Sequence, residues 1–183
     1  MIRLEPLRVD HAPAMLPGLS DPAAYAFLPD DPPAGLAALQ ARYRRQAAGR
    51  SPDGSALWLN WIIRRAPDGA PLGYTQATVT AGLATLAYHV FPPHWRQGIG
   101  RAALAATLDL VFALDDVTLA RALVDTRNDA SRALLASLGF TATRTIERAD
   151  FFKGAPSDET RFELPRRDWR PALSPARPPA PAA

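Results

Sequence analysis

The sequence predicts a mixed α/β domain of the α+β type, with a central, mainly antiparallel sheet and helices on both faces. Three observations support this fold class. Strand-length apolar segments alternate with helical segments in the front part of the chain, a glycine turn joins one strand directly to a helix, and the last strands form a hairpin. The 183 residues, 48% of them hydrophobic, suffice for one core.

The elements are expected in the following order. Residues 2–7 are expected to form the first strand, and Asp10 to cap a short helix whose first turn tolerates Pro13. A second helix is expected over residues 33–48. Alternation and turn residues then predict the remaining strands, the first two joined by the turn P-D-G-A. These strands are expected at 56–65, 72–80, 83–91, 118–126, 140–148 and 160–164.

Two sets of side chains have a structural interpretation. Arg42, Arg44 and Arg45 are interpreted as a solvated face of the second helix, opposite its apolar side. Three aromatic residues are interpreted as core residues and not as parts of a pocket, because aromatic side chains dominate protein cores. These are Trp58, Trp61 and Phe91.

The segment 90–104, V-F-P-P-H-W-R-Q-G-I-G-R-A-A-L, is the most informative part of the chain. A strand is expected to end there in a glycine turn that opens a helix, with Gly98 and Gly100 allowing positive φ and the close approach of an anion. Such a turn directs backbone N–H groups and the positive end of the helix dipole at a phosphate. The missing G-K-[ST] argues against a nucleoside triphosphatase, and the missing third glycine and ribose-binding acid argue against a dinucleotide fold.

A second segment, N-D-A-S-R-A-L-L-A-S-L-G-F over residues 128–140, has the pattern of a capped helix. Asn128 belongs to the best capping residue types, and Gly139 fits the left-handed residue that ends a helix. Ser131 falls at the third helical position. From the residues alone, Asn128 and Ser131 could serve only as a cap and as a solvated residue of the first turn.

Together the two segments resemble the GNAT acetyltransferase superfamily. Val90, Pro92, Trp95, Gly98 and Gly100 follow a pattern similar to the family's acetyl-CoA pyrophosphate loop. The tryptophan, where most members carry Arg or Gln, and the N-x-x-S-x-x-x-L-x-x-L-G-F helix are typical of the branch that resembles the ribosomal-protein N-terminal acetyltransferases RimJ and RimL. The resemblance covers nearly all of residues 1–170 and implies a GNAT-like sheet.

This resemblance implies which residues hold acetyl-CoA as co-substrate. N–H groups around Val90 and Phe91 would pair with the pantetheine arm or the acyl oxygen, so that the ligand lies as an added strand. Asn128 and Ser131 would contact it from the second helix. The loop residues expected to bind it are Arg96, Gln97, Gly98, Ile99, Gly100 and Arg101.

The chemistry implied is direct attack of a neutral amine on a thioester, without a covalent enzyme intermediate. Most family members place a tyrosine seven residues after the asparagine to serve the departing thiolate, but that position here is Leu135, which leaves Ser131 as the nearest donor. Alternation puts Tyr88 on the strand face of Val90, where it could orient the amine, while His89 points the other way.

The base and the acceptor are less defined. Leu86, Thr85 and Ala84 occupy the positions where relatives carry an acid or a histidine, so a water chain ending at Glu147 or Asp158 is the expected substitute. An α-amine, with an ordinary pKa of about 8, needs less help from a base than lysine at about 10.4. The acceptor is expected to be a protein N-terminal α-amine or a small-molecule amine, in a pocket bordered by helix 33–48.

A second interpretation stays open. The missing strand acids and the missing tyrosine also fit a catalytically inactive acyl-CoA-binding or regulatory module of the same fold. The two interpretations differ in one observable, because the module would bind acetyl-CoA without releasing free thiol in the presence of amines.

Composition limits the remaining classes. The chain has no cysteine, and its three histidines form no ligand pattern, so neither disulfides nor a metal are expected. The net charge of +3 arises entirely after Glu163, which argues against a nucleic-acid partner. A charged N-terminus and Asp109 in the longest apolar helix favour a cytoplasmic protein without a membrane partner. We expect a monomer or homodimer with an acetyltransferase domain at 1–170 and a Pro/Ala-rich disordered tail at 171–183.

Overall fold

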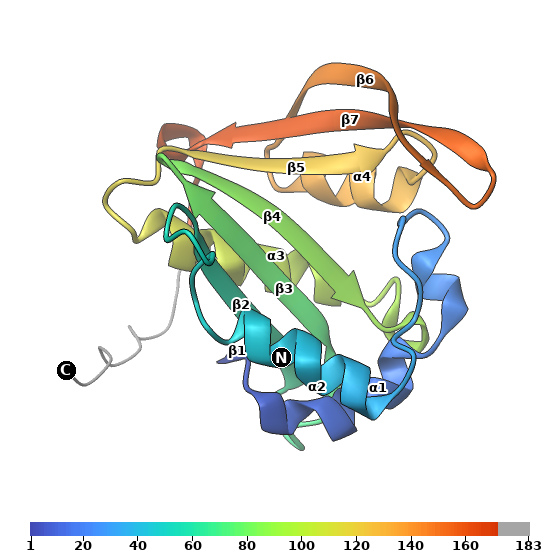
Figure 1. The fold of residues 1–183 in the computed structure, drawn as a ribbon. Coiled ribbons are helices and arrows are strands. Elements are labelled where there is room, and N and C mark those ends of the chain that lie inside the picture. Colours follow the sequence, from blue (N-terminus) through green and yellow to red (C-terminus); the bar gives the residue numbers. More distant parts are fainter. Residues whose placement is uncertain (172–183) are drawn as a thin grey trace.

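A seven-stranded sheet in the order β1-β2-β3-β4-β5-β7-β6 is the centre of the computed structural model, which describes residues 1–171 (Figure 1). The strands are β1 (Ile2–Pro6), β2 (Leu57–Arg65), β3 (Pro71–Thr80), β4 (Leu83–Val90), β5 (Leu119–Asp125), β6 (Thr141–Phe152) and β7 (Ala155–Pro165). The helices are α1 (Ala12–Leu19), α2 (Leu36–Gln46), α3 (Ile99–Phe112) and α4 (Asp129–Ser137). β4 and β5 pair in parallel and the other neighbours are antiparallel, which confirms the predicted fold class.

Helices cover both faces of the sheet, as the sequence predicts (Figure 1). On one face, Leu104 of α3 and Leu135 of α4 are fully buried in a cluster with Ala120 of β5. On the other face, α1 and α2 pack over β2 and β3 through a second buried cluster, in which Leu39 meets Ile62. The alternation of strand side chains therefore supplies buried residues to both faces of the sheet.

Three expected element boundaries change. Asp10 is not the helix cap, because a 3-10 turn at Val9–His11 precedes α1 and the carboxylate of Asp10 accepts a hydrogen bond from Arg8 instead. α2 is shorter than expected and begins after Gly35, whose φ is 149°. Both strands of the final hairpin extend further toward its turn than the alternation predicted. β6 ends at Phe152 instead of residue 148, and β7 begins at Ala155 instead of residue 160.

β4 and β5 stay together for only three residue pairs, ending at Thr85↔Arg121. Beyond them β4 runs on to Val90 and β5 to Asp125, and the two strands diverge (Figure 1). We call this opening, between residues 86–90 and 122–125, the β4–β5 gap. It leaves one edge of β4 without a strand neighbour in the middle of the sheet.

The tip of the β6–β7 hairpin is fastened to the segment between α1 and α2. The ammonium of Lys153 donates hydrogen bonds to the carbonyl oxygens of Tyr25, Leu28 and Asp30, at 2.8, 2.7 and 3.4 Å. In Figure 1 the hairpin accordingly ends beside the blue segment that follows α1. This contact joins parts of the chain more than 120 residues apart.

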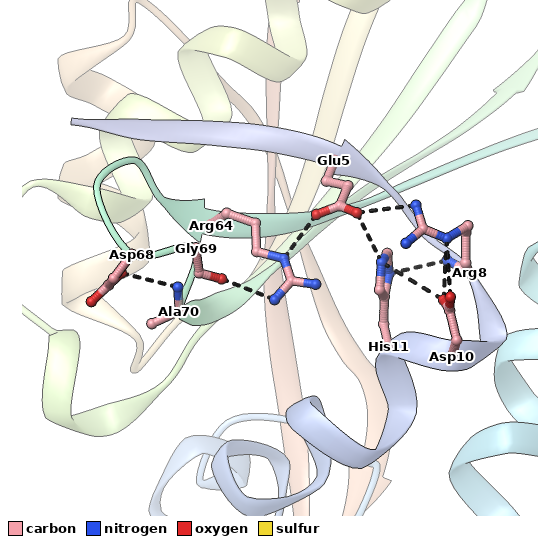
Figure 2. Close-up of polar contacts among 8 residues, drawn as sticks. All are labelled: Glu5, Arg8, Asp10, His11, Arg64, Asp68, Gly69 and Ala70. Atoms are coloured by element: carbon pink, nitrogen blue, oxygen red, sulfur yellow. Dashed lines mark hydrogen bonds and ion pairs between the residues drawn. The ribbon is translucent and has the colours of Figure 1, made fainter.

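A polar network on β1 links the first strand to its surroundings (Figure 2). Glu5 accepts hydrogen bonds from Arg64 Nε at 2.9 Å and from Arg8 Nη1 at 3.0 Å, and His11 Nε2 lies 3.1 Å from its Oε1. The guanidinium of Arg64 continues to the carbonyl of Gly69 in the β2–β3 turn. Burial alone would raise the pKa of Glu5, but Arg64 and His11 outweigh it, so that the pKa lies below its usual value.

Within residues 1–171, no helix is long and apolar enough to cross a membrane, and no group of acidic and histidine side chains has the arrangement of a metal site. Residues 172–183, which make up nearly all of the expected tail, lie outside the described part of the chain.

We predict that Glu5→Gln lowers the free energy of unfolding by roughly 1–3 kcal/mol at pH 7, because charge-assisted hydrogen bonds to a largely buried carboxylate are lost. A carboxyl group whose pKa is depressed by folding stabilises the protein above its unfolded pKa of about 4.3, and this contribution disappears as the pH falls through the folded pKa. Urea unfolding at pH 7 and at decreasing pH should therefore show the difference from wild type shrinking.

Asp10→Asn is the matched control, since the Asp10 side chain is 69% exposed. It should change stability by less than about 0.5 kcal/mol. A Glu5→Gln protein as stable as wild type at pH 7 would contradict the structural importance of the network.

Candidate active site

The turn between β4 and α3 has the geometry of an anion site. Gly98 directly precedes α3 with φ of 75°, and a Cβ added there would meet no atom of the described chain within 4 Å. Arg96 also has a positive φ, of 59°. The first hydrogen bond of the helix runs from the Ala102 N–H to the Gly98 oxygen, which leaves the N–H groups before it to an acceptor outside the helix.

Two side chains brace this turn. The indole Nε1 of Trp95 donates to the Val90 carbonyl at 2.6 Å, and Gln97 Nε2 donates to the Pro93 carbonyl at 3.1 Å. The expected binding residues Arg96, Gln97 and Arg101 are exposed, while Ile99, like Val90, packs against a small buried cluster of Ile63, Leu72 and Ala103. The structure thus brings the expected loop residues together at the start of α3. Trp95 stabilises the conformation of the loop through its hydrogen bond to Val90.

Gly100 allows α3 to approach α4. An added Cβ there would come within 2.8 Å of Leu134 Cδ1. Gly100 therefore has a packing role, in contrast to the open space at Gly98.

The backbone N–H groups of Val90 and Phe91 point to opposite sides of the chain. Phe91 pairs with Leu72 and donates its N–H to the Leu72 oxygen at 2.9 Å, while its carbonyl accepts from His94. Because hydrogen-bonded pairs alternate along an antiparallel ladder, the N–H of Val90, the residue opposite Gly73, points away from β3 and toward the β4–β5 gap. Val90 can present a donor there. The expectation for the Phe91 N–H is wrong, since β3 already uses it.

α4 begins at the other side of the gap. Asn128 caps it, accepting a hydrogen bond from the Ser131 N–H at 3.1 Å, and Gly139 follows its end with φ of 89°. The predicted roles of Asn128 as the helix cap and of Gly139 as the left-handed residue after the helix are both confirmed. Leu135, at the position where relatives are expected to carry a tyrosine, is fully buried in the core and offers no polar group.

Tyr88 of β4 and Ser131 of α4 approach each other across the β4–β5 gap. Burial raises the pKa of the Tyr88 phenol, and the nearby Ser131 hydroxyl offsets part of that effect. The two hydroxyls do not form a direct hydrogen bond, and the Tyr88 oxygen is buried without a partner among the described residues. A buried phenol left in this way is a donor that a ligand in the gap could use.

The opposite face of β4 carries an aromatic cluster. His89 stacks on Tyr74 with ring centroids 5.3 Å apart and also contacts Tyr25 and Phe91. Burial, followed by the charge of Arg42, lowers the pKa of His89 to about 4, so the ring is neutral at physiological pH. His89 points away from Tyr88, as the alternation predicts, and it cannot act as a cation near the gap.

A cluster of carboxylates begins at the end of β5 and continues onto β7 and β6. Asp125, at the end of β5, is opposite Glu159 of β7 in the antiparallel register. Hydrogen bonds from Arg127 and Ser157 hold the pKa of Asp125 well below its usual range. Burial, together with Asp150 and Asp125, raises the pKa of Glu159, which has no ion-pair partner within the described residues. We call Asp125, Asp150 and Glu159 the acidic wall.

The two carboxylates expected from the sequence lie elsewhere on the hairpin. Asp158 accepts a hydrogen bond from the Arg148 N–H at 2.8 Å, and Glu147 is exposed on β6. The sequence does not predict the acidic wall, because its three carboxylates come together only when β7 inserts between β5 and β6. No local pattern predicts that insertion.

A groove runs between α2 and the sheet, with a volume of about 230 Å³. We call it the α2 groove, and it is lined mainly by Arg42, Arg45, Gln46, Trp58, Asn60 and Gln76. Trp58 was expected in the core, but it forms part of this groove, whereas Trp61 and Phe91 are core residues as predicted. Arg42 is half-buried and not on a solvated face, because it lies on the side of α2 that meets β2 and β3.

The comparisons with known proteins agree with this geometry. The family profile of the acetyltransferase (GNAT) domain matches residues 2–141. An uncharacterized N-acetyltransferase, YoaA of Bacillus subtilis (strain 168), is 26% identical over 81 residues, which are 44% of this chain and 46% of that protein. The chain thus aligns with less than half of that relative.

Solved structures share the fold over nearly the whole chain. A GCN5-related N-acetyltransferase from Brucella melitensis superimposes with a TM-score of 0.76 at 18% identity, covering 92% of this chain and 77% of that one. Spermidine N-acetyltransferase from Vibrio cholerae, in complex with CoA and spermine, superimposes with a TM-score of 0.78 at 15% identity, covering 91% and 96%. At these identities the structures establish the fold, and with the domain match over residues 2–141 the chain belongs to the GNAT acetyltransferase family.

Proposed function

We propose that this protein is an acetyl-CoA-dependent N-acetyltransferase that acetylates a primary amine by direct attack. The observation that supports the proposal is the convergence of three features on the β4–β5 gap. These are the gap-facing N–H of Val90, the glycine turn at the start of α3, and the Tyr88 and Ser131 hydroxyls. The proposal includes a RimJ/RimL-like branch, a cytoplasmic location, a monomer or homodimer, and an acetyltransferase domain over residues 1–170.

The residues at the turn fit the diphosphate of acetyl-CoA. The space beside Gly98 and the helix N–H groups that follow it suit an anion held by backbone donors. Exposed Arg96 and Arg101 add positive charge around that space. The Vibrio cholerae relative contains CoA in its crystal structure, which supports the same ligand here.

The proposed reaction forms a bond between the amine nitrogen and the acyl carbon and breaks the bond from that carbon to sulfur. The Val90 N–H supplies a donor for the acyl oxygen as negative charge develops on it. Ser131 supplies a donor for the departing thiolate, with the buried Tyr88 hydroxyl beside it to orient the amine or the serine. Asn128 fixes Ser131 by capping its helix.

We propose that the proton from the amine passes through water to Glu159. Its raised pKa suits a proton acceptor better than the depressed pKa of Asp125, which Arg127 holds ionised. An N-terminal α-amine, with a pKa of about 8, is already partly neutral at pH 7 and needs little assistance. This favours an α-amine as the acceptor, with a small-molecule amine as the other possibility.

We predict that Gly98→Val abolishes acetyl-CoA binding. The valine side chain would fill the open space proposed for the diphosphate and would resist a φ of 75°. Isothermal titration calorimetry with acetyl-CoA should show no measurable heat of binding for the variant.

Gly54→Val is the matched control, because Gly54 has a φ of 73° and equally open surroundings in a different loop. It should carry a similar strain and keep wild-type affinity. Unchanged affinity in a folded Gly98→Val protein would rule out this turn as the diphosphate site.

We predict that Ser131→Ala lowers kcat about 10²-fold while the affinity for acetyl-CoA changes little, because the hydrogen bond strengthens chiefly as charge develops on sulfur. Release of free thiol, followed with a chromogenic reagent over a panel of amines, measures turnover. Tyr88→Phe should lower kcat as well, and the double variant should lose less than the product of the two effects, since the hydroxyls are neighbours.

Ser137→Ala serves as the control on the same helix, because its exposed hydroxyl bonds to the Leu134 carbonyl and to no other group within residues 1–171. Thermal melts verify that each variant is folded. Wild-type turnover in Ser131→Ala would remove the serine from the mechanism. Acetyl-CoA binding without thiol release from any amine would favour the inactive binding module.

A further inference from the structure

The α2 groove and the small cavity beside it contain polar groups that the protein itself leaves unsatisfied. Arg42 Nε, Tyr43 Oη and Gln46 Oε1 are buried and have no hydrogen-bond partner among residues 1–171. The small cavity of about 10 Å³, which Arg42, Tyr43 and Gln46 help to line, has room for roughly one water molecule. Buried polar groups in native structures are almost always paired, so a cluster of orphans indicates a place for a ligand.

The unsatisfied cluster carries a positive charge. In the described part of the chain neither Arg42 nor Arg45 forms an ion pair, whereas Arg64 and Arg121 of the sheet do. The charge of Arg42 reaches the neighbouring ring of His89. A half-buried guanidinium without a counter-ion is costly, and a carboxylate satisfies it best because both groups are planar and can form two parallel hydrogen bonds.

The groove lies beside the proposed reaction centre. Gln76 in its lining pairs with Ala87 of β4, and Tyr74, which lines the small cavity that shares Arg42 with the groove, pairs with His89. Both β4 residues border the β4–β5 gap. An acceptor whose amine lies in the gap can therefore extend along β3 to Arg42.

From these contacts we infer that the α2 groove selects amine acceptors that carry a carboxylate apart from the reacting amine, and that Arg42 is the specificity-determining residue. The inference rests on the proposed acetyl transfer and identifies its substrate class. The ammonium end of such an acceptor faces the acidic wall and its carboxylate end faces Arg42, so the charges along the site match the charges along the ligand. A polyamine, positive throughout, matches the acidic wall but is repelled at Arg42.

Dipeptides of one length test the charge requirement. Ala-Glu amide carries a side-chain carboxylate, Ala-Gln amide is its neutral isostere, Ala-Lys amide is its cationic counterpart, and Ala-Gln with a free C-terminus carries the carboxylate on the backbone. With wild-type protein and saturating acetyl-CoA, kcat/KM for the preferred carboxylate dipeptide should exceed that for Ala-Gln amide by roughly tenfold or more. Ala-Lys amide and spermidine should be the poorest acceptors.

Variants of α2 then locate the preference. In Arg42→Gln the advantage of the carboxylate should fall to within about twofold, mainly through a higher KM for the carboxylate dipeptide. Arg44→Gln is the matched control, because Arg44 is an exposed arginine of the same helix outside the groove. Arg42→Lys should keep part of the preference, since it retains the charge but not the two parallel hydrogen bonds.

The outcomes separate this inference from the proposed function. Equal turnover of all four dipeptides, or a preference that survives in folded Arg42→Gln, overturns the inference and leaves acetyl transfer intact. Absence of thiol release from every acceptor overturns the proposed function. In that case, calorimetry with Ala-Glu amide and Ala-Gln amide decides the inference, which requires Arg42-dependent binding of the first and fails without it.

Discussion

The early end of the parallel pairing between β4 and β5 determines the rest of the site. A strand in the middle of a sheet normally has both edges occupied, so its N–H and C=O groups are unavailable to ligands. Here β4 loses its β5 neighbour after Thr85, and the N–H of Val90 faces an opening that is flanked by the beginnings of α3 and α4. The sheet thus provides a backbone edge in its interior, where the two core clusters hold the surrounding elements in place.

Around this opening the two faces of the sheet carry different groups of side chains. On the α3 and α4 face, the hydroxyls of Tyr88 and Ser131 meet beside the glycine turn. On the α1 and α2 face, neutral His89 stacks on Tyr74, which lines the small cavity beside the unsatisfied Arg42. The period-2 geometry of β4 makes this division possible, because adjacent residues contribute to opposite sides of one opening.

Local patterns in the sequence predicted much of this arrangement. Alternation predicted most strands and the opposite directions of Tyr88 and His89, and capping rules predicted the ends of α4. Features that depend on pairing register were missed. The N–H of Phe91 is used by Leu72, and the neighbour of Asp125 is Glu159 because β7 enters between β5 and β6. The position of Arg42 was misjudged for a related reason, since the helical period does not show which flank of α2 meets the sheet.

The insertion of β7 also has a consequence for how the chain reaches this structure. β5 cannot complete its hydrogen bonding until β7, whose paired residues lie 34 to 46 positions later, arrives between it and β6. The Lys153 contacts with Tyr25 and Leu28 span still longer separations. Closing such long loops is slow, and an unpaired β5 exposes a strand edge in the meantime. The side of the gap that carries the acidic wall is therefore the part of the molecule expected to form last, so a partly folded chain could acquire the glycine turn before it acquires the surface that would receive an amine.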